Sequence, residues 1–166
     1  MIVSNAGPLI HLTKIGRLNL LKELFKSVVI PNTVKIEVVD RGKEKGAADA
    51  FLIENEVRKW IVAEEDINDR VKEIAKRAGI EMGEAIAIMF AKEKGFPALI
   101  DDSAARRFAI GLGLEVIGSI GVLIKATKAG IITKEEALDG LEKLAKVMWL
   151  SVDVYEDARK TIEGLK

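Results

Sequence analysis

Pro97-Ala-Leu-Ile-Asp-Asp-Ser103 is the stretch that decides how this chain folds. Its apolar part, Pro97 to Ile100, predicts a short buried strand, and apolar positions recur at helical spacing from Ser103 to Leu112. Asp101 and Asp102 therefore stand where a buried strand ends and a helix begins. Adjacent carboxylates in that position need cations or amide donors nearby. The stretch thus predicts a strand–helix unit with a polar site at the carboxyl end of the strand.

The same alternation of strand and helix runs along the rest of the chain. Strands separated by helix-length segments imply crossover connections and a parallel sheet covered by helices on both faces. In such sheets, sites lie at the carboxyl ends of the strands. The predicted strands are 2–4, 28–30, 60–62, 97–100 and 115–117, and helices are predicted at about 8–15, 18–25, from 32 or 33 onward, 47–54, 66–78, 83–94, 103–112, 120–129 and 134–145.

Chain length and helix-start signals predict one domain. No repeat, low-complexity tract or linker divides the 166 residues, which suit a single domain over 1–166. Thr133 with Glu136 predicts a capping box, and Asp153 with Glu156 suggests another near the C-terminus. The last helices, from about residue 133, are expected to cover the sheet edge or to mediate self-association.

Composition narrows the classes of function. The chain has 26 basic and 26 acidic side chains, so nucleic-acid affinity must come from a local patch or a metal. The absence of cysteine excludes disulfides, thiolate catalysis and zinc–thiolate sites. The one histidine, His11, disfavours a histidine metal site or a Ser-His-Asp triad, and it is interpreted as structural. The richness in Lys and Glu is typical of hyperthermophile proteins.

We expect a cytoplasmic protein without a membrane span. The N-terminus lacks the basic and apolar regions of a signal peptide. The longest apolar run, Ala85 to Ala91, is far shorter than the roughly 20 residues that a span needs.

Acidic positions beside apolar runs form a candidate metal site. Asn5 ends the first predicted strand, so it shares a sheet edge with Asp101 and Asp102 if the two strands are neighbours. Glu37 and Glu84 lie on helices that could lean over this edge. Mg²⁺ and Mn²⁺ favour oxygen ligands, and several carboxylates around such ions are the usual arrangement for phosphodiester hydrolysis. Without metal, the acids should repel one another, which raises some carboxylate pKa values.

Each acid also has an ordinary interpretation. Glu37 could be a solvated helix residue, Glu84 could favour a helix N-terminus by its charge, and Asp102 could be an N-cap. Two features favour a site. The aspartates follow a buried strand, and the seven residues after Glu84 are all apolar.

Ordered motifs along nearly the whole chain resemble those of PIN-domain proteins, and the resemblance is closest to a branch once catalogued as a domain of unknown function. Any one motif is weakly specific, but the ordered set is fairly specific. The motifs are Val3-Ser-Asn-Ala-Gly-Pro-Leu-Ile10, Lys14-Ile-Gly-Arg-Leu18, Pro31-Asn-Thr-Val-Lys-Ile-Glu-Val-Val39, Gly83-Glu-Ala-Ile-Ala87, Leu99-Ile-Asp-Asp-Ser-Ala-Ala-Arg-Arg107, Gly118-Ser-Ile-Gly-Val-Leu123 and Lys128-Ala-Gly-Ile-Ile132.

The resemblance implies a three-layer α/β/α PIN-like fold with a central, mainly parallel sheet of four to five strands. It implies an endoribonuclease dependent on Mg²⁺ or Mn²⁺, in which a metal-activated water cleaves the RNA. It also implies a VapC-like toxin role with a small antitoxin partner, and we expect a homodimer. The metal-site positions of the family fall on Asn5, Glu37, Glu84 and the pair Asp101 and Asp102, and the closer ligand of that pair stays open. Glu37, Glu84, Asp101 and Asp102 are the expected catalytic residues.

Asn5 departs from the family pattern, because active PIN nucleases usually have aspartate at this position. An amide oxygen can ligate a hard cation, but it brings no charge and cannot act as a base. A second interpretation is therefore a PIN-fold protein that binds RNA or protein partners without cutting.

Other signals are weaker. Arg106 and Ser119 are candidate phosphate contacts, and the alternatives are a solvated helix face for Arg106 and simple N-capping for Ser119. Trp60, Trp149 and Tyr155 are too scattered to indicate base stacking, so we expect core or dimer contacts. The glycines between residues 111 and 118 suggest a nucleotide-binding loop, but they leave a helix and enter a strand, which is the wrong context.

Overall fold

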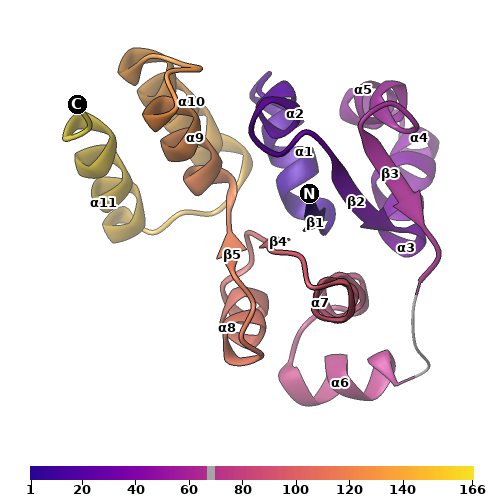
Figure 1. The fold of residues 1–166 in the computed structure, drawn as a ribbon. Coiled ribbons are helices and arrows are strands. Elements are labelled where there is room, and N and C mark those ends of the chain that lie inside the picture. The colour runs from indigo at the N-terminus through magenta and orange to yellow at the C-terminus, as the bar shows by residue number, and fades with distance from the viewer. Residues whose placement is uncertain (67–69) are drawn as a thin grey trace.

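A computed structural model describes residues 1–66 and 70–166, and within them five parallel strands form one sheet in the order β3-β2-β1-β4-β5 (Figure 1). Each predicted strand is present, within a few residues of its expected position. The prediction of a parallel sheet is therefore confirmed. The strands are β1 (Ile2–Ser4), β2 (Val28–Pro31), β3 (Ile61–Glu64), β4 (Ala98–Leu99) and β5 (Val116–Ile117).

Strand β1 lies in the middle of the sheet, with two strands on each side of it. The chain first adds β2 and β3 on one side, then returns to pair β4 beside β1 and ends the sheet with β5. Val3 pairs with Ala98 and Ser4 with Leu99. Asn5 and Asp101 therefore follow neighbouring strands, which meets the condition under which the sequence places them at one edge of the sheet. A ligand crevice is expected where the strand order reverses, and that point lies between β1 and β4.

Helices cover both faces of the sheet, which gives the predicted three-layer α/β/α fold. One layer holds α7, which packs on β1, β2 and β4, together with α6 and α8 (Figure 1). The other holds α1, α2 and α9, with α5 beside α1. The helices are α1 (Ala6–Lys14), α2 (Asn19–Phe25), α3 (Asn32–Lys35), the π-helix η1 (Ile36–Arg41), α4 (Gly42–Glu44), α5 (Ala48–Glu56), α6 (Val71–Ala78), α7 (Met82–Lys94), α8 (Ser103–Gly111), α9 (Ser119–Lys128), α10 (Lys134–Val147) and α11 (Val152–Glu163).

Helix starts test the capping predictions. The Thr133–Glu136 capping box is confirmed, because the Glu136 N–H donates to Thr133 Oγ1 at 3.1 Å and the Thr133 N–H donates to Glu136 Oε2 at 2.8 Å. The box predicted at Asp153 is wrong. Ser151, itself a favoured N-cap residue, accepts from the Val154 N–H at 3.1 Å and starts α11 earlier. The helix predicted over 66–78 is described as α6 from Val71, and its residues 67–69 lie outside the described part.

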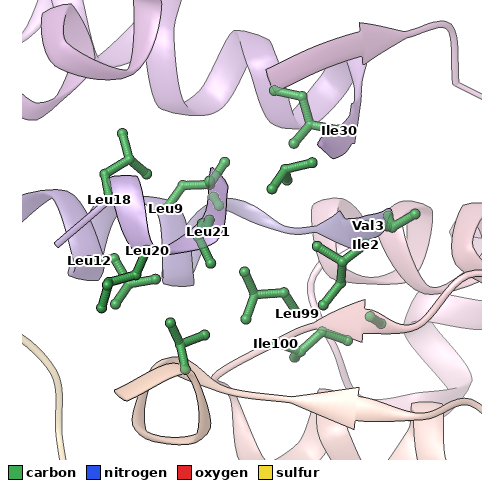
Figure 2. Packing of buried hydrophobic residues seen from close by; sticks show 14 of the residues in the cluster. Ile2, Val3, Leu9, Leu12, Leu18, Leu20, Leu21, Ile30, Leu99 and Ile100 are labelled. Atoms are coloured by element: carbon green, nitrogen blue, oxygen red, sulfur yellow. The ribbon is translucent and has the colours of Figure 1, made fainter. Parts of the chain in front are cut away.

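One apolar core joins the sheet to helices on both of its faces. Figure 2 shows leucines of α1 and α2, among them Leu9 and Leu21, beside Ile2 and Leu99. The last helices share this core, since α10 packs on α1 and α9, and α11 packs on α9 and α10. Their role in self-association stays a prediction.

The two tryptophans differ in burial. Trp60 is buried, as expected of a core residue, and its Nε1 donates to Glu56 Oε2. Trp149 is 84% exposed, so a core role for it is wrong. It lies in the connection between α10 and α11, where neither helix covers it. None of the described helices has both the length and the apolar character needed to cross a bilayer.

Candidate metal centre

A cleft of about 380 Å³ opens beyond the carboxyl ends of β1 and β4. Five elements contribute to it: the start of α1, the π-helix η1, the start of α7, the β4–α8 junction and the α10–α11 connection. All five predicted metal-site positions line this cleft, so the structure brings them together. Their roles as ligands stay a prediction. The lining includes Asn5, His11, Glu37, Glu81, Glu84, Asp101, Asp102, Ser103, Met148 and Trp149.

Asn5 presents an unpaired buried oxygen in the wall of the cleft. The residue is 5% exposed, and its Oδ1 is the one buried side-chain polar atom of the described residues without a hydrogen-bond partner. Buried acceptors are rarely left unpaired, because the loss of hydration costs about 1–3 kcal/mol. A cation or a ligand donor in the cleft would satisfy this oxygen.

Glu37 enters the cleft from the π-helix η1 (Ile36–Arg41). Single π-turns are rare and often occur at functional sites, because the extra residue redirects a side chain. Glu37 lies against the start of α7, where a Cβ added to Gly83 would come within 3.1 Å of Glu37 Oε2. Burial raises the pKa of Glu37 and the charge of Glu81 raises it further, while Arg41 lowers it.

Glu84 has a structural role at the start of α7. The Glu81 N–H donates to Glu84 Oε2 at 3.0 Å, which forms half of a capping box. The ordinary interpretation of Glu84 as a helix-start residue is therefore correct, but it leaves the carboxylate in the cleft. Burial raises the pKa of Glu84 most, and the charges of Asp102, Glu81 and Glu37 raise it further, while the Glu81 backbone bond lowers it. The predicted mutual repulsion of the acids is thus seen at Glu84, whereas the charge that raises the pKa of Glu37 is that of Glu81, which was not among the predicted positions.

Both oxygens of Asp101 accept hydrogen bonds from protein donors. Its Oδ1 accepts from the Ser119 N–H at 2.6 Å, and its Oδ2 accepts from the Ser119 hydroxyl at 2.6 Å. His11 Nδ1 lies 2.8 Å from the same Oδ2 and donates to it, since a carboxylate can only accept. The Asp101 side chain is 7% exposed. Asp101 therefore ties the end of β4 to α1 and α9.

Asp102 is exposed, lines the cleft and accepts fewer hydrogen bonds than Asp101. Its Oδ2 accepts from the Ala105 N–H at 2.9 Å, so the predicted N-cap is confirmed. Among the described residues, its other oxygen accepts no hydrogen bond. Of the two aspartates, Asp102 thus has an oxygen available to a ligand, whereas both oxygens of Asp101 are used.

The two predicted phosphate contacts have partners within the protein. Ser119 is fully buried on Asp101, and it is the first residue of α9 after the N-cap position Gly118, so simple N-capping by Ser119 is wrong. Arg106 Nη1 donates to the Ile100 carbonyl at 3.0 Å. Their contacts with a substrate stay predictions.

Sequence reasoning missed several residues of the cleft, among them the ionisable side chains of His11 and Glu81. His11 contacts a partner 90 positions away, and no local pattern signals such a pairing. Glu81 could have been found, because a glutamate three residues before Glu84 has the spacing of a capping box.

The residues present fit a hard divalent cation in their donor chemistry. Within 1–66 and 70–166, no three His, Asp or Glu side chains already form a group that could hold a metal. The donors around the cleft are nevertheless oxygens, which Mg²⁺ and Mn²⁺ prefer. Two carboxyls with raised pKa and one unpaired amide oxygen are the groups that a cation would stabilise.

The three-layer fold and its acidic cleft at the β1–β4 junction define a three-layer α/β protein with a candidate site for a divalent cation. A family model described as a PIN domain matches residues 1–164, and the chain therefore belongs to the PIN-domain family. The resemblance seen in the sequence motifs is thereby confirmed. The PIN domain is a nuclease fold, and PIN domains generally use divalent metals. Comparison with curated proteins and with solved structures found no match.

Proposed function

We propose that this protein is a PIN-type endoribonuclease that depends on Mg²⁺ or Mn²⁺. The observation that carries the proposal is the unpaired, buried Oδ1 of Asn5 in the same cleft as five carboxylates. A cleft rich in carboxylates repels a phosphodiester unless a cation neutralises it. The unpaired oxygen and the acids together therefore favour a metal-dependent reaction on a phosphate substrate.

Asn5, Glu37, Glu84 and Asp102 are the residues that would hold the ion. When bound, such an ion polarises the phosphodiester, activates water and stabilises the leaving oxygen. Asp101 acts differently in this proposal, because Ser119 and His11 already use both of its oxygens. It positions the β4–α8 junction, and with it Asp102.

The chain's own residues also supply proton chemistry. Glu84 Oε2 is held by the Glu81 N–H, so the carboxyl is fixed while Oε1 is left for the ion or for a proton. Burial raises the pKa of Glu37 and of Glu84, which brings both carboxyls closer to the pH at which a group can accept and return protons.

Glu84→Gln tests the proposal. Glutamine keeps the capping-box bond but loses the charge, so the fold should persist while Mn²⁺-dependent cleavage of single-stranded RNA falls at least about 100-fold. Glu136→Gln is the matched control, because Glu136 occupies the same capping position on α10, which lies outside the cleft lining. Undiminished cleavage by purified Glu84→Gln protein would contradict the proposal.

A second candidate function is binding without cleavage. It is favoured by the neutral side chain at Asn5 and by the engagement of both Asp101 oxygens. Titration calorimetry with Mn²⁺ separates the two candidates. No binding by the wild type, and no gain on Asn5→Asp, supports the binding protein, whereas robust RNA cleavage by the wild type eliminates it.

The VapC-like toxin role belongs to the same proposal. Its partners would be RNA, a small antitoxin protein and a second copy of the chain. Growth arrest on induced expression, relieved by a protein that also blocks RNA cleavage in vitro, would support the toxin role. Sedimentation of the purified chain tests the homodimer.

A further inference from the structure

Trp149 is the most exposed large apolar side chain among the described residues. It belongs to the connection between α10 (Lys134–Val147) and α11 (Val152–Glu163), which comes down toward β5 (Figure 1). The residue lines the acidic cleft. An exposed aromatic that lines a candidate active site, beside further apolar surface, is a candidate ligand contact.

A second groove, of about 420 Å³, lies on the other side of Trp149. Its walls are mainly apolar and come from β5, the start of α9 and the start of α11. Arg106 is the one basic residue that lines it. The apolar wall comprises Val116, Ile117, Ile120, Leu150 and Val154.

The groove and the acidic cleft adjoin, and the two together are called the trough below. They share Asp101, Ser103, Met148 and Trp149, so Trp149 stands at the border between them. The character of the lining changes across this border. One side presents carboxylates and an unpaired amide oxygen, and the other presents apolar side chains and one guanidinium.

We propose that the groove binds a nucleobase of single-stranded RNA, next to the phosphate that is cut, with Trp149 as its stacking platform. This inference rests on the proposed function. An aromatic face, apolar walls and a nearby arginine are the features of sites that hold single-stranded nucleic acid by stacking. Because the net charge is zero, affinity must come from such local contacts. Adjacency to the cleft favours the substrate strand over an unrelated ligand.

Cleavage kinetics with Mn²⁺ and short single-stranded RNA test the proposal. Trp149→Ala should raise KM about tenfold with kcat nearly unchanged, since stacking binds the strand without taking part in the reaction. Trp149→Phe should recover most of the loss. Val154→Phe, which adds bulk to the groove wall, should also raise KM. Phe51→Ala is the control, because Phe51 is a half-exposed aromatic on α5 that lines neither part of the trough.

An unchanged KM for Trp149→Ala would overturn the proposal. If the sedimentation of that variant changes as well, the cover of this face is a second copy of the chain.

The proposal can be tested even if the wild type does not cut RNA, in which case the proposed function fails. Trp60→Phe leaves Trp149 as the sole tryptophan, so its fluorescence reports directly on the groove. Hexa-adenylate in the presence of Mn²⁺ should then quench it saturably, while polyphosphate, which has no bases, should not. No quenching, or equal quenching by both, overturns the groove assignment.

Discussion

Asn5 is the residue at which the proposed metal site can be tested most directly. Its oxygen is buried, unpaired and in the cleft, but it carries no charge. Asn5→Asp adds a carboxylate beside groups that already repel one another. In EDTA the melting temperature should therefore fall by a few degrees. With saturating Mn²⁺ it should exceed that of the wild type, and Mn²⁺ affinity measured by calorimetry should rise about tenfold.

Asn55→Asp provides the control for this prediction. Asn55 is exposed on α5, outside the lining of the cleft, so the same charge change there should leave Mn²⁺ affinity unaltered. If Mn²⁺ affinity rises equally in both variants, the cause is the change in net charge, and the role assigned to Asn5 is wrong.

Asp101 and Asp102 are adjacent, but replacing each by asparagine should change a different property of the protein. Asp101→Asn weakens bonds from Ser119 and His11, so the free energy of unfolding should fall by about 2–3 kcal/mol. Asp102→Asn keeps a good N-cap, so stability should change little while Mn²⁺ affinity falls about tenfold. Urea denaturation in EDTA and calorimetry measure the two effects. A stable Asp101→Asn protein that no longer binds Mn²⁺ would reverse the assignment.

Glu37 and Glu84 predict a pH dependence of stability in the absence of metal. Their pKa values are raised on folding above the usual 4.5, chiefly by burial, so the folded state binds protons more readily than the unfolded chain. Stability should therefore be greater below pH 4.5 and decline as the pH rises through the raised pKa values. The double variant Glu37→Gln/Glu84→Gln should lack this decline, as measured by calorimetric melting in EDTA. The predicted pH dependence is refuted if the melting temperature of the wild type rises with pH relative to that of the double variant.

At the scale of elements, the turn between β5 and α9 must pass close to the end of β4. A Cβ on Gly118 would lie 2.8 Å from Arg106 Nη1 and 2.9 Å from Asp101 Oδ1, although its φ of −111° suits any residue. Gly118→Ala should therefore cost about 1–3 kcal/mol through crowding and displace Asp101. Gly111→Ala, at the end of α8 with open space around it, should be neutral or stabilising. Equal stability of the two variants in urea would contradict this.

The elements themselves were largely predictable, because their signals are local. Strand positions and the Thr133 cap follow from residue patterns a few positions long. The shared sheet edge of Asn5 and Asp101 followed from a general rule for parallel sheets. Long-range pairings were not predictable, and the bond between His11 and Asp101 is one of them, since no spacing in the chain encodes it. The exposure of Trp149 excludes the core contact expected for it and leaves the dimer contact as a prediction, because no local pattern distinguishes the two.

At the scale of the whole molecule, charge is balanced globally and separated locally. The 26 acids and 26 bases cancel, yet the cleft gathers carboxylates while the adjoining groove offers Arg106. Long-range attraction of RNA is therefore weak, and the acidic cleft itself repels phosphate. Affinity must come from a bound cation, from stacking and from very few phosphate contacts.

This charge distribution predicts a shallow salt dependence of RNA binding. With about two phosphate contacts, the slope of log affinity against log salt is about −1.4 for a single strand. Raising NaCl from about 50 to 200 mM at fixed Mn²⁺ should then weaken binding only about sevenfold, whereas a basic RNA-binding surface would lose 10³-fold or more. Fluorescence anisotropy with labelled single-stranded RNA and the non-cleaving Glu84→Gln protein measures the slope. A steep slope would show that a basic surface elsewhere, and not the trough, dominates RNA binding.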